Sequence, residues 1–262
     1  MGPAFLLGQS EEHPHRVYLG PDVFYRNYEE KLKLPLKSHD HGVFYGFQLG
    51  YDYKKNNTVY GAFDFAYAWG NVVYNGSLTN LVTSKVRFTK DRSINRILNT
   101  EIRLGFNAVP KTLTQLNLIP YLGFGYLRWH RDIGYKEIYS WEFLSGGLLT
   151  TYDINEYYNL GLNIKAMRMI NGKIKIHIEN FALELNLGNL WQFGVELPMT
   201  IALNFDKTWD LRFVPYYYQK NIGKSNSRTI KLIDIEDKFI SMDEPSSHTY
   251  IIGSRLELGY SF

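Results

Sequence analysis

Apolar and polar residues alternate strictly along several segments of this chain. From 191 to 205 every odd position is apolar, whereas the even positions carry Gln, Gly, Glu, Pro, Thr, Ala and Asn. The same two-residue period recurs in 43–53, 59–69, 98–108 and 250–262. Successive side chains of a β-strand point to opposite faces, so each segment predicts a strand with one apolar face.

Two all-β architectures produce such alternation. A soluble barrel or sandwich turns its apolar face inward, whereas a transmembrane barrel turns it to lipid. The polar face is composed mainly of Gly, Ala, Asn, Gln and single charged residues, which suit a crowded lumen better than a solvated surface. The segments also exceed the usual soluble strand length of about 5 to 6 residues and approach the length that crosses a bilayer. The pattern therefore favours a transmembrane antiparallel up-and-down β-barrel.

Ten strands are predicted, with eight or twelve as the alternatives, and they form one domain over 16–262, preceded by an N-terminal extension or remnant at 1–15. The predicted strands are 16–28, 42–54, 58–70, 98–108, 117–130, 138–150, 158–170, 190–205, 208–220 and 248–262. The connectors between them alternate short and long, as in outer-membrane barrels, and an even strand count puts both termini on the periplasmic side. Two further alternating runs, Lys173 to Ile178 and Val82 to Phe88, either raise the count or extend hairpins beyond the membrane.

Composition and charge narrow the class further. The 262 residues are 45% hydrophobic and 16% aromatic, which excludes a disordered chain and favours strands. The 29 basic and 26 acidic residues are too balanced and too dispersed for nucleic-acid binding. The absence of cysteine excludes disulfides, thiolate metal sites and cysteine nucleophiles.

The last strand ends in alternating apolar residues and a terminal aromatic: Leu256, Leu258, Tyr260 and Phe262. This ending resembles the assembly signal of bacterial outer-membrane β-barrel proteins, and the run Pro120 to Tyr126 is similar to a strand opening of the small porin-like superfamily. The segments 16–28 and 42–53 more loosely resemble uncharacterised outer-membrane proteins of chlamydia-like bacteria. The resemblance implies a Gram-negative-type outer membrane and recognition of the last strand by the barrel-assembly machinery.

Strand parity places thirteen charged residues in the lumen, and acids outnumber bases among them. They are Asp22, Arg26, Asp52, Asp64, Glu101, Arg103, Glu142, Lys165, Glu196, Asp210, Arg212, Arg255 and Glu257. A barrel of about ten strands is only a little wider than the eight-stranded size that side chains fill. The set therefore predicts a hydrogen-bonded charge network that closes the lumen, with a narrow, weakly cation-preferring pore as the alternative.

Other candidate sites are weaker. The pairs His13/His15 and His39/His41 each share a strand face but have no third ligand, so no metal site is assigned. Ser247 and His248 adjoin the last strand, yet neighbouring residues point to opposite faces and no nucleophile elbow is present, so no catalytic residue is assigned. Aromatic residues at strand ends, including Tyr157, Tyr158, Trp191, Trp209 and 216–218, are expected to anchor the barrel at both interfaces.

The sequence thus predicts an integral outer-membrane protein with a structural or adhesin-like surface-interaction role, no catalysis and no cofactor. The alternative is passive diffusion through a porin-like channel, followed by an outer-membrane enzyme. The expected partners are outer-membrane lipid and lipopolysaccharide, the barrel-assembly machinery, and a host or surface ligand bound by the external loops; nucleic acid is not expected.

Overall fold

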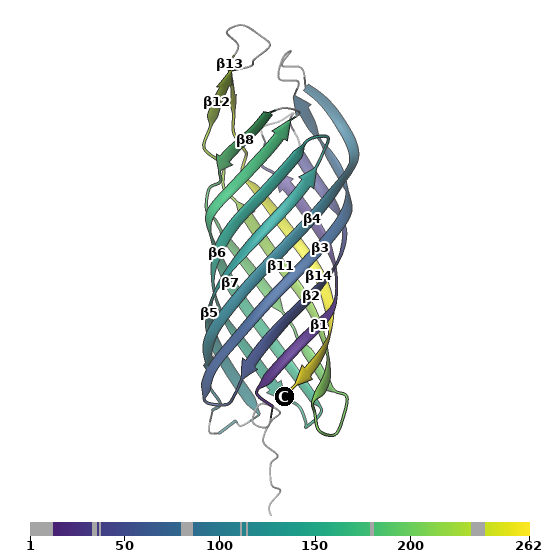
Figure 1. The fold of residues 1–262 in the computed structure, drawn as a ribbon, viewed down its shortest axis with the longest axis vertical. Helices are drawn as coiled ribbons and strands as arrows, with labels where there is room; N and C mark the ends of the chain where they lie inside the picture. The colour runs from purple at the N-terminus through teal and green to yellow at the C-terminus, as the bar shows by residue number, and fades with distance from the viewer. Residues whose placement is uncertain are drawn as a thin grey trace, which may run out of the picture.

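The computed structural model describes residues 13–32, 36, 38–79, 86–110, 112–113, 115–178, 181–231 and 239–262. Its strands form a tall, tilted barrel in which β1 begins and β14 ends at one end, which we call the terminal end, and the β12–β13 hairpin lies at the opposite, distal end (Figure 1). The strands are β1 (His15–Glu30), β2 (Ser38–Lys54), β3 (Thr58–Thr79), β4 (Val86–Asn107), β5 (Leu116–Asp132), β6 (Lys136–Asp153), β7 (Tyr158–Ile178), β8 (Phe181–Asn186), β9 (Trp191–Glu196), β10 (Met199–Ala202), β11 (Trp209–Ile222), β12 (Arg228–Lys231), β13 (Phe239–Met242) and β14 (Ser247–Ser261).

The barrel is closed by antiparallel pairing of the first and last strands. β1 pairs with β14 over its length, from Arg16 opposite Ser261 to Glu30 opposite Ser247. The segments β8, β9 and β10 all pair with β7, and together they occupy one strand position. The result is the predicted ten-stranded antiparallel barrel, which confirms the fold class. Among the described residues, no helix is long and apolar enough to cross a membrane.

The distal connectors differ from the sequence prediction. The segments 71–97 and 171–189 were expected to be long loops, but β3 and β4 each run for 22 residues and β7 runs for 21. The run Lys173 to Ile178 extends the β7–β8 hairpin and adds no wall strand. Of the run Val82 to Phe88, residues 82–85 lie outside the described residues and the rest belong to β4. The strands therefore continue past the length that a bilayer requires.

Apolar side chains cover the outside of the half nearest the termini, and we call this surface the membrane belt. It includes Leu104 (63% exposed), Leu122 (74%) and Leu203 (54%), as well as the alternate residues of the last strand. Trp209 and Tyr158 lie outward at the terminal rim, and Trp191 lies outward nearer the distal end. Tyr216 and Tyr218 differ from their predicted anchoring role because both point into the lumen, where their hydroxyls reach acidic residues.

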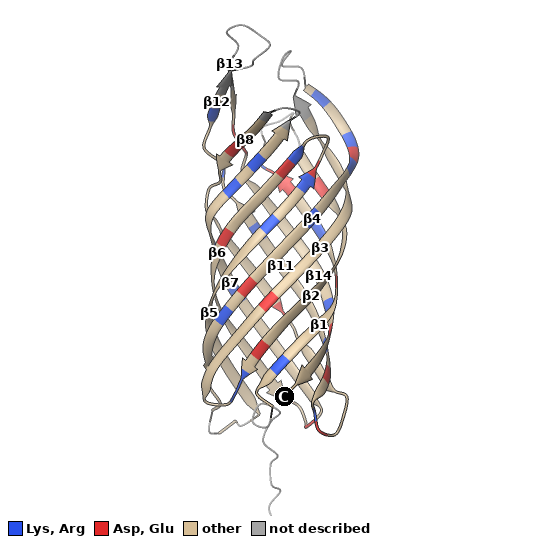
Figure 2. Ribbon diagram, viewed as in Figure 1, with Lys and Arg blue, Asp and Glu red and all other residues tan. Residues whose placement is uncertain are grey.

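Both faces of the wall change character at the same height. Along β5 the outward residues pass from Phe124 and Tyr126 to Arg128, while the inward residues pass from glycine to Leu127 and Trp129. β7 shows the same exchange, from Lys165 to Met167 inside and from Ala166 to Arg168 outside. Charged residues occur along the full height of the strands (Figure 2). The two halves differ in which face of the wall carries the charged residues. We call the part of the barrel beyond the membrane belt the distal extension. Its interior is mainly apolar and its exterior is polar.

A bulge in β7 preserves this arrangement near the hairpin tip. Asn171 has a positive φ of 51°, and the pairing of β6 with β7 shifts register between Ser140 and Glu142. Across the bulge the inward positions of β7 change from odd to even residue numbers. Ile174 and Ile176 therefore face inward, and Lys173 and Lys175 stay outside. Asn171 donates a hydrogen bond from Nδ2 to Glu142 Oε2 at 2.8 Å across the outer face.

Candidate functional site

The lumen of the belt half contains buried ion pairs. Arg16 binds Asp210 through two hydrogen bonds, Nε to Oδ2 at 2.8 Å and Nη2 to Oδ1 at 2.7 Å. Its other terminal nitrogen, Nη1, lies 3.7 Å from Asp52 and 3.5 Å from Glu257. Arg212 contacts the same two acids, so side chains from four consecutive strands of the wall, β11, β14, β1 and β2, are tied together inside the lumen.

A second layer of pairs lies further along the lumen. Arg103 contacts Asp64 at 2.5 Å, and Lys165 donates a hydrogen bond to Glu101 at 2.8 Å. Arg255 links the layers, because it lies 3.2 Å from Glu196 and 3.5 Å from Glu257. Neutral groups satisfy further acid oxygens; Ser145, for example, donates to Glu101 at 2.6 Å. We call these two layers of side chains the charge plug. Buried carboxylates and cations are tolerated in such a layer when they are paired and hydrogen-bonded.

Twelve of the thirteen charged residues predicted for the lumen point inward, and Glu142 does not. The twelve inward residues are Asp22, Arg26, Asp52, Asp64, Glu101, Arg103, Lys165, Glu196, Asp210, Arg212, Arg255 and Glu257. Glu142 lies on the outer face because its neighbours Trp141 and Phe143 pack inward, in the region where the apolar face of the wall is the inner one. The parity rule that read every apolar position as lipid-facing fails at this height.

Sequence reasoning also missed several lumen residues. Arg16 shares the parity of Asp22 and Arg26, so the alternation of the first strand could have identified it. With Arg16 counted and Glu142 removed, acids and bases in the plug are nearly equal in number. The acid surplus from which a cation preference was predicted is therefore largely gone.

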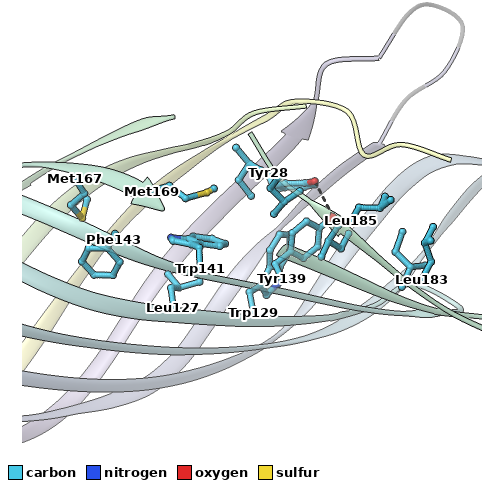
Figure 3. Packing of buried hydrophobic residues seen from close by; sticks show 14 residues of the cluster. Tyr28, Leu127, Trp129, Tyr139, Trp141, Phe143, Met167, Met169, Leu183 and Leu185 are labelled. Atoms are coloured by element: carbon cyan, nitrogen blue, oxygen red, sulfur yellow. Dashed lines mark hydrogen bonds between the residues drawn. The ribbon is translucent and has the colours of Figure 1, made fainter. Parts of the chain in front are cut away.

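The distal extension is filled by an apolar and aromatic cluster, the distal core. Figure 3 shows its side chains projecting into the barrel, with the Trp129, Tyr139 and Tyr28 rings grouped together. Trp129 and Tyr139 stack with ring centroids 4.5 Å apart. The members are Tyr28, Leu127, Trp129, Tyr139, Trp141, Phe143, Met167, Met169, Ile174, Ile176, Leu183, Leu185, Leu187 and Ile222. This packing resembles the interior of a soluble protein more than the polar interior usual for outer-membrane barrels.

One buried arginine holds the distal edge of this core. Arg131 is 1% exposed, and its guanidinium contacts Asp40 at 2.7 Å, Glu137 at 2.8 Å and Glu30 at 3.1 Å. Glu244, from the connector before β14, accepts a hydrogen bond from Tyr139 at 2.6 Å. Burial raises the pKa of Glu244 well above its ordinary value, and the charges of Glu30 and Glu137 raise it further. Arg131, its three acidic partners and Glu244 all lay in predicted connectors, so strand parity did not assign them to the lumen.

Within the described residues, three cavities lie along the lumen. Two of them, of about 100 and 80 Å³, are lined by charge-plug residues and share Asp52 and Arg212. The third, of about 110 Å³, lies toward the distal end and is lined largely by aromatic and aliphatic side chains, including Trp129, Trp141 and Phe143. The chain therefore offers a polar passage that side chains fill and a separate, mainly apolar chamber.

The candidate histidines and serine occupy ordinary positions in the wall. The His39 and His41 rings stack with centroids 4.8 Å apart, and His15 packs against Phe262. The described part of the chain contains no group of three or more side chains placed to hold a metal ion. Ser247 is buried, with 3% of its surface exposed. His248 lies 3.5 Å from Glu29, a residue that is exposed.

Among solved structures, the match to the outer membrane protease OmpT supports the fold class. The outer membrane protease OmpT from Escherichia coli matches with a TM-score of 0.62 at 9% identity, covering 95% of this chain and 96% of that one. Outer membrane protein OprG from Pseudomonas aeruginosa matches with a TM-score of 0.44 at 10% identity, covering 97% and 99%. The toluene transporter TodX from Pseudomonas putida matches with a TM-score of 0.35 at 10% identity, covering 99% and 95%.

A closed antiparallel barrel with an apolar outer belt and a charged lumen is the fold of bacterial outer-membrane β-barrel proteins, and this chain has that fold. At these identities the likeness concerns the fold alone. No protein-family model and no curated protein sequence matches the chain. The looser resemblance to proteins of chlamydia-like bacteria stays a prediction.

Proposed function

We propose that this protein is a closed outer-membrane barrel that acts at the cell surface through its distal extension and conducts no solute. The charge plug carries this proposal. Its pairs place side chains in the lumen from strands that do not pair with each other, such as Arg16 of β1 with Asp210 of β11 and Lys165 of β7 with Glu101 of β4, and both bases are largely buried. A solute or ion passing through the barrel would have to displace these side chains, and separating a pair costs several kcal/mol for each charge left unpaired in a dry environment.

The distal extension supplies the interaction surface. Its outer face carries basic side chains such as Arg128, Lys173 and Lys175, and the β12–β13 hairpin rises above the barrel wall (Figure 1). A folded core beneath this surface holds it in one shape, so a partner can be bound without ordering a flexible loop. The partner proposed is a host or surface ligand.

Planar-bilayer recording tests the closed barrel. The wild-type protein is expected to show no conductance. Removing one plug pair by Arg16→Ala with Asp210→Ala is expected to produce small openings, because two side chains that line the cavity at the terminal end are lost. Arg128→Ala, on the outer face, is the matched control and should stay silent. A large, weakly selective conductance from the wild-type protein would contradict the proposal.

A narrow channel is the second candidate. The three cavities follow one another, and adjacent ones share lining residues such as Gln48 and Lys165, so a short rearrangement of side chains could connect them. A small wild-type conductance that increases in the Arg16→Ala, Asp210→Ala variant would favour this candidate. Because the plug is nearly balanced in charge, only weak ion selectivity is expected.

The orientation follows from the outer-membrane proposal, with both termini in the periplasm and the distal extension outside. The chain has no cysteine, so single introduced thiols can report on it. Lys175→Cys, which replaces a side chain that is 55% exposed, should react with a membrane-impermeant maleimide on intact cells. Asn57→Cys, at the terminal-end turn, should react only after the cells are broken. The opposite labelling pattern would reverse the orientation.

The last strand is proposed to be the signal for the assembly machinery. Leu256, Leu258, Tyr260 and Phe262 all point outward, between 40% and 51% exposed. Deleting Phe262 should lower insertion in cells while leaving the stability of refolded protein almost unchanged, because one terminal side chain buries little area. Lipid and lipopolysaccharide are proposed to contact the belt and the basic residues just beyond it. Normal outer-membrane levels of the deletion variant would remove the signal proposal.

No catalysis is part of the proposal. Ser247 points inward and His248 points toward Glu29 on the outer side, so the two do not form a nucleophile and base. Casein and lipid-ester hydrolysis by the refolded protein, with a Ser247→Ala variant as control, should give no activity above background. Turnover that Ser247→Ala abolishes would assign an enzyme.

A further inference from the structure

The mainly apolar chamber lies between two apolar clusters inside the barrel. On its distal side it is bounded by Trp129, Trp141 and Phe143 of the distal core. On the β1 and β14 side it is bounded by Phe24 and Ile251, which belong to a separate cluster. Its volume of about 110 Å³ is more than packed side chains ordinarily leave between them. Figure 3 shows Phe143, Trp141 and Met167 along the wall that the chamber borders.

Two basic side chains line the chamber without an acidic partner. Arg26 is 4% exposed, and within the described residues it has no ion pair and no hydrogen bond. Its guanidinium lies 3.7 Å from the centroid of the Trp129 ring, a contact that compensates only part of the cost of burying the charge. Lys220 likewise has no ion pair among the described residues, and its ammonium lies 5.8 Å from the Tyr218 ring centroid.

The other charged groups of the chamber wall are already engaged. Lys165 is paired with Glu101, and Arg255 is paired with Glu196. The single acid of the lining, Asp22, accepts a hydrogen bond from Tyr216 at 2.7 Å. The chamber is therefore an apolar space with an excess of buried positive charge. A bound anion would supply the partner that these basic side chains lack.

We infer that the chamber binds an amphipathic anion, a medium-chain carboxylate whose hydrocarbon body packs against the distal core and whose head pairs with Arg26 and Lys220. Burial of the hydrocarbon contributes affinity in proportion to the apolar area removed from water. A carboxylate beside a buried guanidinium forms a charge-assisted hydrogen bond, about twice as strong as a neutral one. This inference goes beyond the proposed surface role and does not depend on whether the plug conducts.

Tryptophan fluorescence can test the inference directly. The chain has five tryptophans, and Trp129 and Trp141 line the chamber whereas Trp69, Trp191 and Trp209 lie outward. Replacing the three outward residues by Phe leaves a protein whose emission comes only from the interior. This protein, refolded into lipid vesicles, is titrated with 10-bromodecanoate, whose bromine quenches tryptophan on contact.

The expected result is saturable quenching that 10-bromodecanol, with the same chain and no charge, reproduces only at a concentration at least tenfold higher. Arg26→Met should weaken bromodecanoate binding by at least tenfold and leave bromodecanol binding unchanged. Lys220→Met should weaken it several-fold. Lys173→Met, on the outer face, is the matched control and should have no effect.

Three outcomes would overturn the inference: no saturable quenching, equal binding of the acid and the alcohol, or binding by Arg26→Met as tight as that of the parent. If Arg26→Met does not refold, Lys220→Met and Arg26→Lys decide the question in the same assay. The silent bilayer recording expected of the wild-type protein is unaffected by any of these results, so a failure here is distinguishable from a failure of the closed-barrel proposal.

Discussion

The two halves of the barrel interior hold the wall together by opposite means. In the belt half, buried ion pairs such as Arg16 with Asp210 and Arg103 with Asp64 join nearby strands inside the lumen. In the distal extension, aromatic rings and aliphatic groups fill the interior, and the stacked Trp129 and Tyr139 belong to this cluster. The outer surface changes in the opposite sense, from the apolar membrane belt to the charged side chains of the distal extension.

The difference follows from the surroundings of each half. Where lipid covers the wall, apolar residues gain nothing by turning inward, so the lumen takes the polar side chains and must pair them. Where water covers the wall, the hydrophobic effect again favours an apolar interior. The distal extension is therefore a small water-exposed barrel built on the same strands as a transmembrane one.

The largest effect is expected from leaving a plug charge without its partner. Glu101→Gln removes the acid that pairs with buried Lys165, and we expect a loss of about 3 to 5 kcal/mol in the free energy of unfolding. The same substitution at Glu184, in an exposed pair with Lys173 and Lys175, should cost less than about 1 kcal/mol. Denaturant unfolding in lipid vesicles measures both. Equal losses would show that the plug is solvated.

Truncation in the distal core comes next. Ile174 is fully buried, and Ile174→Ala should cost about 2 to 5 kcal/mol through lost burial and the cavity that it leaves. Its neighbour Lys173 points outward, so Lys173→Ala should change stability by less than about 0.5 kcal/mol. Protease resistance of the distal extension and global unfolding report the two effects. A similar result for both variants would contradict an apolar interior at this height.

Arginine substitution on one strand compares the two outer surfaces. Leu104 and Ile94 lie on the outer face of β4 and are similarly exposed, at 63% and 56%. Leu104→Arg places a charge in the membrane belt and should cost about 2 to 4 kcal/mol. Ile94→Arg lies in the distal extension and should change the free energy of unfolding by less than about 0.5 kcal/mol. A large cost at Ile94 would place the membrane boundary nearer the hairpin tips.

The smallest effect concerns pH and the distal extension alone. The raised pKa of Glu244 means that the folded state holds this proton more tightly than the unfolded state does. Its contribution to stability is therefore fully present below the ordinary value of about 4.5 and is lost as pH rises through the raised pKa. Hydrogen exchange at Tyr139 and its neighbours, corrected for intrinsic rates, should become faster as the pH rises above the ordinary value of about 4.5.

Glu244→Gln is the control for this titration. It keeps an acceptor for the Tyr139 hydroxyl while removing the ionisable group. Much of the pH dependence should therefore disappear, although Glu137 still faces Arg131 in the same cluster. An unchanged profile in the variant would assign the pH dependence to other groups.

Alternation alone was sufficient to predict the ten-stranded barrel, because closing a sheet in lipid demands a two-faced wall. It was insufficient for the distal extension, since alternation is identical whichever face is apolar. Glu142 was assigned to the lumen for this reason, although Trp141 beside it fills the interior. Arg131 and Glu244 were not predicted as interior residues, because both lie in connectors between the predicted strands, where strand parity assigns no face.

The bulge at Asn171 has a consequence for how the β7–β8 hairpin can change in evolution. Deletion of Asn171 alone would remove the extra residue and restore regular pairing of β6 with β7, so Ile174 and Ile176 would stay inside and Lys173 outside. Loss of one residue from a regular part of β7 would instead exchange the faces of all the strand residues that follow it. Lineages without the bulge should therefore be one residue shorter at this point of β7 and keep the same residues on each face.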